Sequence, residues 1–234
     1  AATEQLDEIR KGAEEGAAAV RRDENMAVRK VHVIARRQAV VSAGAIAEEA
    51  RKGYSMLMVG LGGAVSREGG FGPAIEDAAR GFDGPLCLVS SRADRFAELK
   101  GTSTILVPVN GTGVCRSAAD FALALARPRG ARVRVLYVSR GTRRPSASLF
   151  HRPEEAVLRD LAELAERYGV PVETAMRASA RPEEAIRREA ARAAMIIMGV
   201  TQRPGERLFF GDTVTSILSL YPGPVVLVAA ERGL

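Results

Sequence analysis

The sequence predicts an α/β protein in which a strand–helix pattern forms parallel sheet in two successive units. Short apolar runs, of a length suited to buried strands, alternate with amphipathic stretches spaced for helices. The segment 194–230 reads as strand, loop with glycines, helix and strand, which is a βαβ unit. The two halves of the sequence also align with each other when one is shifted by a fixed number of residues. Together these observations favour a repeated α/β fold.

The first half begins with an amphipathic helix over 6–20, where Leu6, Ile9 and Ala13 share one face. Valines that alternate with basic residues predict a strand over 27–35. Ser42 caps a predicted helix that runs to residue 51. A buried strand over 56–61 leads into a loop rich in glycine, which a short helix over 74–80 and a buried strand over 85–89 follow.

The second half is longer. Its predicted strands are 104–109, 132–138, 170–175, 195–198 and 225–229, and its predicted helices are 114–126, 154–168, 182–193 and 214–221. Pro153 suits the first position of its helix, because its missing N–H has no partner there. The sequence Pro-Gly-Pro at 222–224 ends the last helix. A basic loop fills 140–152.

An offset of about 139 positions places Gly60 on Gly199, Gly72 on Gly211 and Pro85 on Pro224. Paired glycines at one offset indicate two repeated units, which we assign to 1–100 and 101–234. By the same offset the first unit lacks the equivalent of the strand, helix and strand at 104–138. Either upstream residues or another element supplies these parts, and the first unit is incomplete as given.

The composition excludes several classes of protein. Hydrophobic residues make up 47% and charged residues 26%, an ordinary globular balance, and no apolar run has the ~20 residues that span a bilayer. Two cysteines, Cys87 and Cys115, lie in or beside apolar segments and are expected to be reduced core residues. The net charge is +6, but aromatic residues are only 5% and no nucleic-acid motif is present. We therefore expect no nucleic-acid partner.

A candidate anion site follows the strand that begins at Met195. The strand stops at Gly199, a polar loop holds Gly205, and a helix starts near Gly211-Asp212-Thr213. Such a loop offers backbone N–H groups and a helix N-terminus to an anion such as phosphate.

This segment resembles the nucleotide loop of the universal stress protein family. The family pattern is glycine, two residues, glycine, nine residues, and glycine followed by Ser or Thr; Gly199 and Gly211 match its first and last glycines. Gln202 stands where the second glycine belongs, the following spacing is one residue short, and Asp212 replaces Ser or Thr. The longer sequence segments RPGERLFFGDT and GGFGPAIEDAARGFDGPL resemble the cytosolic tails of bacterial sodium/proton antiporters, which carry tandem domains of this kind.

The resemblance implies a Rossmann-like, doubly wound parallel sheet in each unit, and a site for ATP or AMP beyond the carboxyl ends of the strands. It places Pro108, Val109 and Asn110 near base and ribose, and Val138 beside the adenine. The residues that it assigns to the phosphates are Met198, Gly199, Gly205, Gly211, Asp212 and Thr213.

Three departures from the family pattern affect this expectation. Asn110 replaces an aspartate whose carboxylate would accept hydrogen bonds from the ribose hydroxyls. Asp212 would repel a triphosphate unless a cation lies between them, and the alternative role for it is a helix N-cap. Thr213 offers a hydroxyl in place of the missing Ser or Thr. In the first unit Pro73 removes one N–H donor, and we expect no nucleotide there.

Catalytic and metal sites are not expected. His32 and His151 lie far apart in sequence, and no Ser/His/Asp order or metal-ligand spacing is visible. The chain is therefore expected not to be an enzyme.

Three functions remain open. The first is a cytosolic regulatory domain of a cation/proton antiporter that senses an adenine nucleotide or another small ligand, with the membrane transport domain in cis. The second is a free tandem stress protein that binds ATP or AMP, and the third is a dimerisation scaffold without ligand. The first implies a cytoplasmic location on the cytosolic face of the bacterial inner membrane, where the basic loop 140–152 would favour anionic lipid.

The resemblance also implies a homodimer, because the family pairs its edge strands across a dimer contact. The corresponding runs here are 86–89 and 225–228. Since unprotected edges tend to pair, these two runs are expected to contact each other.

Overall fold

The computed structural model describes residues 11, 48–49, 52, 54–61, 71–80, 82, 84–91, 99, 101–139, 153–201 and 210–229. The chain forms two compact units, Ala1–Val41 and Ser42–Leu234. Every element described below belongs to the second of these. The elements expected at 6–20, 27–35 and 42–51 lie wholly or mostly outside the described residues, as does the loop 140–152.

The described elements alternate as the sequence predicts. The strands are β1 (Leu57–Leu61), β2 (Leu86–Ser90), β3 (Thr104–Val109), β4 (Arg132–Ser139), β5 (Val172–Ala178), β6 (Met195–Val200) and β7 (Val225–Ala229). The helices are α3 (Pro73–Arg80), α4 (Gly113–Ala126), α5 (Pro153–Tyr168), α6 (Pro182–Ala190) and α7 (Asp212–Leu220), with a 3-10 turn, η2 (Arg127–Arg129).

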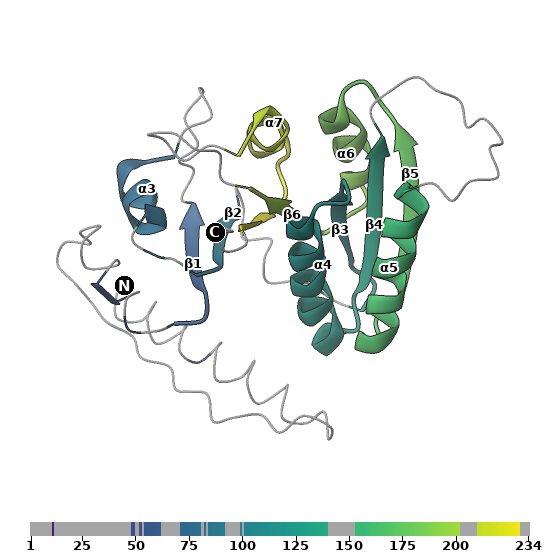
Figure 1. The fold of residues 1–234 in the computed structure, drawn as a ribbon, viewed down its shortest axis with the longest axis horizontal. Helices are drawn as coiled ribbons and strands as arrows, with labels where there is room; N and C mark the ends of the chain where they lie inside the picture. Colours follow the sequence, from purple (N-terminus) through teal and green to yellow (C-terminus); the bar gives the residue numbers. More distant parts are fainter. Residues whose placement is uncertain are drawn as a thin grey trace. The chain divides into compact units, whose positions relative to one another are not determined.

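These strands form one seven-stranded sheet in the order β1-β2-β7-β6-β3-β4-β5 (Figure 1). All neighbours are parallel except β2 and β7. The predicted α/β class and the mostly parallel sheet are confirmed. The chain moves outward from β3 to β4 and β5, then returns to the other side of β3 through β6 and β7, so the strand order reverses at β3.

The antiparallel junction of β2 and β7 joins two parallel parts of the sheet. Its register pairs Leu86 with Ala229 and Ser90 with Val225, so that Leu88 lies opposite Leu227. The expected contact between these two apolar runs is confirmed. Leu88 and Leu227 are also equivalent by the offset of about 139, so the junction is centred on a pair of matching positions.

Helices cover both faces of the sheet (Figure 1). Buried residues of α4 and α5 pack with alternate strand residues such as Ile105, Val133 and Ile197 on one face. Buried residues of α6 and α7 pack on the opposite face with the other set, which includes Leu136 and Ile196. This two-sided burial explains why β3, β6 and β7 read as continuous apolar runs. Both cysteines are buried and free, as expected.

Several element boundaries differ from the sequence prediction, among them the start of β5 and the end of α6. The strand expected from Val170 begins at Val172, because Val170 N–H still bonds to Ala165 O at the end of α5, after Gly169 at φ +65°. The helix expected to reach residue 193 ends at Ala190. The unit boundary expected between residues 100 and 101 stays a prediction. No helix in the described part of the chain is both long and apolar enough to cross a bilayer.

Candidate functional site

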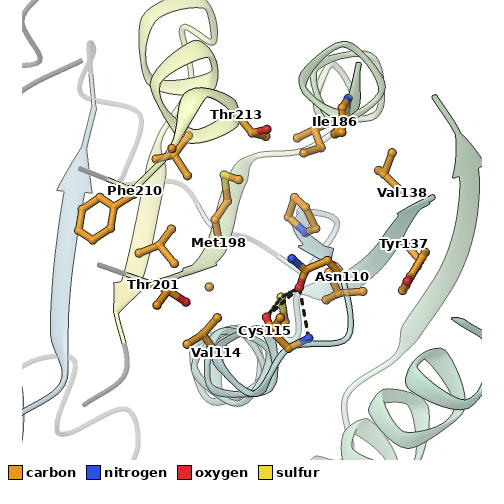
Figure 2. Close-up of a pocket in the computed structure, with 18 of the residues that line it drawn as sticks. Asn110, Val114, Cys115, Tyr137, Val138, Ile186, Met198, Thr201, Phe210 and Thr213 are labelled. Carbon is orange, nitrogen blue, oxygen red and sulfur yellow. Dashed lines mark hydrogen bonds between the residues drawn. The ribbon is translucent and has the colours of Figure 1, made fainter. Parts of the chain in front are cut away.

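A cavity of about 800 Å³ lies at the carboxyl ends of β3, β4 and β6 (Figure 2). Its walls include the last residues of these strands and the first turns of α4, α5, α6 and α7. Ligands of open α/β sheets bind where the strand order reverses, because adjacent connections leave on opposite faces and open a crevice there. The cavity occupies that position, beside β3.

Nine of the ten residues that the resemblance assigns to a ligand line this one cavity. They are Pro108, Val109, Asn110, Val138, Met198, Gly199, Gly211, Asp212 and Thr213. The tenth, Gly205, lies outside the described residues. The residues come from the ends of three strands, from the residue after β3 and from the start of α7, and the fold brings these distant positions together.

Asn110 follows β3 and is held by its own loop. Its Oδ1 accepts the backbone N–H of Thr112 at 3.2 Å, the hydroxyl of Thr112 at 2.7 Å and the Sγ–H of Cys115 at 3.1 Å. A backbone N–H can only donate, so this contact fixes which side-chain atom is the oxygen. The Nδ2 group faces the cavity (Figure 2), and Asn110 therefore presents a hydrogen-bond donor there.

Gly199 is required by close packing of β6 on α4. A Cβ at this position would lie 2.2 Å from the carbonyl oxygen of Val114 and 2.7 Å from the amide nitrogen of Cys115. Both are backbone atoms of the first turn of α4, and no side-chain movement relieves the overlap. Gly199 thus seats α4 on the sheet, a role that the family pattern does not indicate.

The start of α7 corrects one interpretation. The N-cap of α7 is Gly211, at φ +100°, and no side chain caps the helix. Asp212 is the first residue of α7, so the N-cap role considered for it is wrong. Its carboxylate belongs to the first turn, where a negative charge is favoured by the helix dipole. Thr213 points toward the cavity (Figure 2).

Sequence reasoning missed twelve lining residues. They are Thr112, Val114, Cys115, Tyr137, Ser139, Glu154, Pro182, Ile186, Val200, Thr201, Phe210 and Val214. Most lie next to predicted strand ends or in first helical turns, and the rule that such ends converge in parallel sheets would have found several of them.

The charged residues that line the cavity within the described chain are both acidic, Glu154 and Asp212. Burial raises the pKa of Tyr137, and the nearby side chains of Glu154 and Cys115 raise it further. The phenol of Tyr137 is therefore neutral at physiological pH and keeps its proton to donate. Among the described residues no group of three or more His, Cys, Asp or Glu is placed to hold a metal.

One wall of the cavity is supported from the first half of the chain. Phe210 lines the cavity, and its ring packs edge-on against Phe71 with centroids 5.7 Å apart and an interplanar angle of 71°. Edge-to-face contacts at this separation are favourable for aromatic rings. Phe71 itself does not line the cavity. These two residues are also equivalent by the offset of about 139.

Comparison with known proteins points to one family. Residues 101–229 match the model of the universal stress protein family, and no curated protein matches the chain. The chain is similar in structure to a universal stress protein from Archaeoglobus fulgidus DSM 4304, with 21% identity and a TM-score of 0.59 over 99% of this chain and 82% of that one.

Two further similar structures contain adenine nucleotides. One is the Archaeoglobus fulgidus universal stress protein in complex with dAMP, with 18% identity and a TM-score of 0.44 over 54% of this chain and 97% of that one. The other is an Arabidopsis thaliana family protein with AMP bound, with 16% identity and a TM-score of 0.41 over 56% of this chain and 93% of that one.

Proposed function

Because this chain belongs to the universal stress protein family, we propose that its cavity binds an adenine nucleoside or nucleotide, AMP or ATP among them. The observation that carries the proposal is that nine residues implied by the resemblance line one cavity at the reversal of strand order. A cavity of about 800 Å³ is within the range of small-molecule sites. The chain acts as a ligand-binding module and not as an enzyme.

The lining divides by chemistry in a way that suits such a ligand. Met198, Val138 and Ile186 supply apolar surface for a base, and their side chains lie around the cavity in Figure 2. Asn110 supplies a donor for a hydroxyl or ring acceptor. The first turn of α7, which no side chain caps, offers backbone N–H groups to a phosphate.

Calorimetric titration of the purified chain with adenosine, AMP and ATP, with and without magnesium, tests the proposal. Gly211→Val is a poor blocking variant, because its positive φ strains any side chain. Thr213→Tyr instead fills the cavity from α7 and should remove binding. Leu220→Tyr is its matched control, since Leu220 lies on the same helix, is exposed and does not line the cavity. Absence of heat and of thermal shift at millimolar ligand would overturn the proposal.

The wider role we propose is regulation of a monovalent cation/proton antiporter by this chain, as a tandem pair of stress-protein units. Support comes from the segments that resemble antiporter tails and from the symmetric register at the β2–β7 junction, where Leu88 pairs with its repeat equivalent Leu227. The corresponding location is the cytosolic face of the bacterial inner membrane, with the transport domain in cis.

Transport in vesicles tests this wider role. A ligand shifts transport only if it binds two conformations of the domain with different affinity. Full-length protein and protein cut before this chain should therefore differ in activity or in response to nucleotide and pH. Equal behaviour would rule out regulation and leave the free module or the ligand-free scaffold. A homodimer would need another surface than the runs 86–89 and 225–228, because these pair within the chain; light scattering of the isolated chain measures its oligomeric state.

A further inference from the structure

We propose that the outer edge of β5 is a self-association surface, to which a second copy of this chain adds its own β5 in antiparallel orientation. β5 is the last strand in the order of the sheet, and β4 is its only strand neighbour among the described residues (Figure 1). The surface is separate from the ligand site, because none of the residues of β5 lines the cavity.

The backbone of β5 presents every second residue to this edge. The N–H of Val133 donates to the carbonyl oxygen of Pro171, and the N–H of Ser179 donates to that of Ser139, both at 3.0 Å. Because peptide groups alternate along a strand, the odd-numbered residues of β5 face β4 and the even-numbered ones face outward. The outward residues are Val172, Thr174, Met176 and Ala178. The described residues offer no backbone acceptor to the N–H groups of these four, so a second strand can pair with them.

The side chains of β5 leave this edge open. Glu173, Thr174, Arg177 and Ala178 are exposed, and the strand contains neither proline nor glycine. Proteins commonly protect an edge strand with proline, a bulge or charged side chains. Of these devices β5 has only its two charges, Glu173 and Arg177, and they have opposite signs.

These charges complement each other in one register. An antiparallel pair centred on Ala175 brings outward residues together, with Thr174 of each copy opposite Met176 of the other, and it pairs the whole strand. The same register places Glu173 of each copy opposite Arg177 of the other, in non-hydrogen-bonded pairs whose side chains lie close. A slip by two residues loses both charge pairs, and a slip by four places like charges opposite each other.

The contacts within the chain hold these side chains ready for a partner. Glu173 is 67% exposed, and its ion pair with Arg134 is long, at 3.7 Å. Arg177 is 48% exposed and is fixed by Glu189, which accepts its Nε at 2.8 Å and its Nη2 at 2.7 Å. Its Nη1 donates to the carbonyl oxygen of Met176 at 3.0 Å, and that oxygen keeps a second lone pair for a partner strand.

Sedimentation velocity of the full chain over a range of concentrations tests the surface by exchange of charges. Glu173→Arg alone and Arg177→Glu alone each place like charges opposite each other in a homodimer, whereas an equimolar mixture of the two variants restores both opposite-charge pairs in a heterodimer. Glu163→Arg and Arg187→Glu, alone and mixed, are the controls, because both residues are exposed on helices. Thermal melting confirms that each variant is folded.

We expect the wild-type chain to dimerise, each edge variant to weaken the dimer about tenfold or more, and the mixture to recover most of the loss, while the controls behave as wild type. A wild-type chain that stays monomeric at the highest concentration reached overturns the inference. A dimer that both edge variants keep also overturns it, because that dimer uses another surface. Folded variants that fail to associate when mixed overturn it as well.

A disulfide measurement stands even if an edge variant does not fold. Ala175→Cys places a thiol on the two-fold axis, where the two Cα atoms lie about 4.5 Å apart, within the range for a disulfide. Oxidised glutathione should therefore link two copies covalently. Thr174→Cys is the control, because its two copies lie about 7–8 Å apart on a diagonal, and Cys87 and Cys115 are buried. No link through Ala175→Cys, or equal links in both variants, overturns the inference.

Discussion

Gly199→Ala should destabilise the protein much more than the same change at Gly60. The two glycines occupy equivalent positions in β6 and β1 by the offset of about 139. A Cβ at Gly199 would lie 2.2, 2.5 and 2.7 Å from backbone atoms of Val114 and Cys115, whereas a Cβ at Gly60 meets nothing within 4 Å. The difference arises because α4 packs on β6 at this point.

The magnitude follows from the contacts. An ordinary contact begins near 3.4 Å, so α4 must move by about 1 Å at its first turn. Overpacking costs about 1–3 kcal/mol, and three backbone overlaps place Gly199→Ala near the upper value. For a domain of this size about 3 kcal/mol lowers Tm by about 6–12 °C. Gly60→Ala should stay within about 0.5 kcal/mol of wild type or gain slightly, because alanine has less freedom to lose on folding.

Denaturant unfolding of both variants at equal protein concentration provides the measurement. Ligand affinity is the second readout, since Val114 and Cys115 line the cavity and should move with α4. Equal unfolding midpoints for the two variants would refute the reasoning, as would a stable Gly199→Ala protein with unchanged affinity.

Three other predictions concern an ion pair, a buried thiol and an aromatic contact. Glu189→Gln should cost about 1–3 kcal/mol in denaturant unfolding, because Glu189 is the 2.9 Å partner of Arg134, which is only 16% exposed; Glu184→Gln, on the same helix in an exposed pair, should cost under about 0.5 kcal/mol. Burial raises the pKa of Cys87 to about 11, so the unfolded chain loses this proton first. Between pH 9 and 11 this thiol should lower the free energy of unfolding by up to about 1.4 kcal/mol per pH unit, and Cys87→Ala should remove that part of the slope; identical slopes in the two proteins would contradict the assignment. Phe71→Ala should weaken adenosine binding in calorimetry although Phe71 does not line the cavity, since it supports the ring of Phe210; unchanged affinity would show that this wall stands without it.

The strands could be predicted from the sequence because a strand that is buried on both faces is a continuous run of apolar residues. β6 and β7 are recognisable for this reason, and the pairing of 86–89 with 225–228 was expected from the family resemblance, which places these runs at sheet edges. Boundaries depend on hydrogen bonds that no local pattern displays. β5 extends to Ala178 because Arg177 and Ala178 pair with the end of β4, and Val170 is drawn instead into the end of α5.

The site was predicted in part for a related reason. Residues that end β3, β4 and β6 could be placed together, because parallel strands bring their carboxyl ends to one edge. The reason for Gly199 could not be found, since it depends on how closely α4, about 85 positions earlier in the chain, approaches the sheet. The role of Asp212 depended on one residue of register at the start of α7, which an N-cap pattern does not resolve.

The β2–β7 junction has a consequence for how the protein is made on the ribosome. β2 is complete at Ser90, but its partner Val225 is added about 135 residues later. At about 5–20 residues per second this interval lasts roughly 7–27 s. During that time a strand whose Cys87 and Leu88 are fully buried in the finished sheet has no β7 to pair with. Nascent chains stalled before residue 225 should therefore recruit chaperones or aggregate, whereas chains stalled with residue 229 outside the ribosomal tunnel should not.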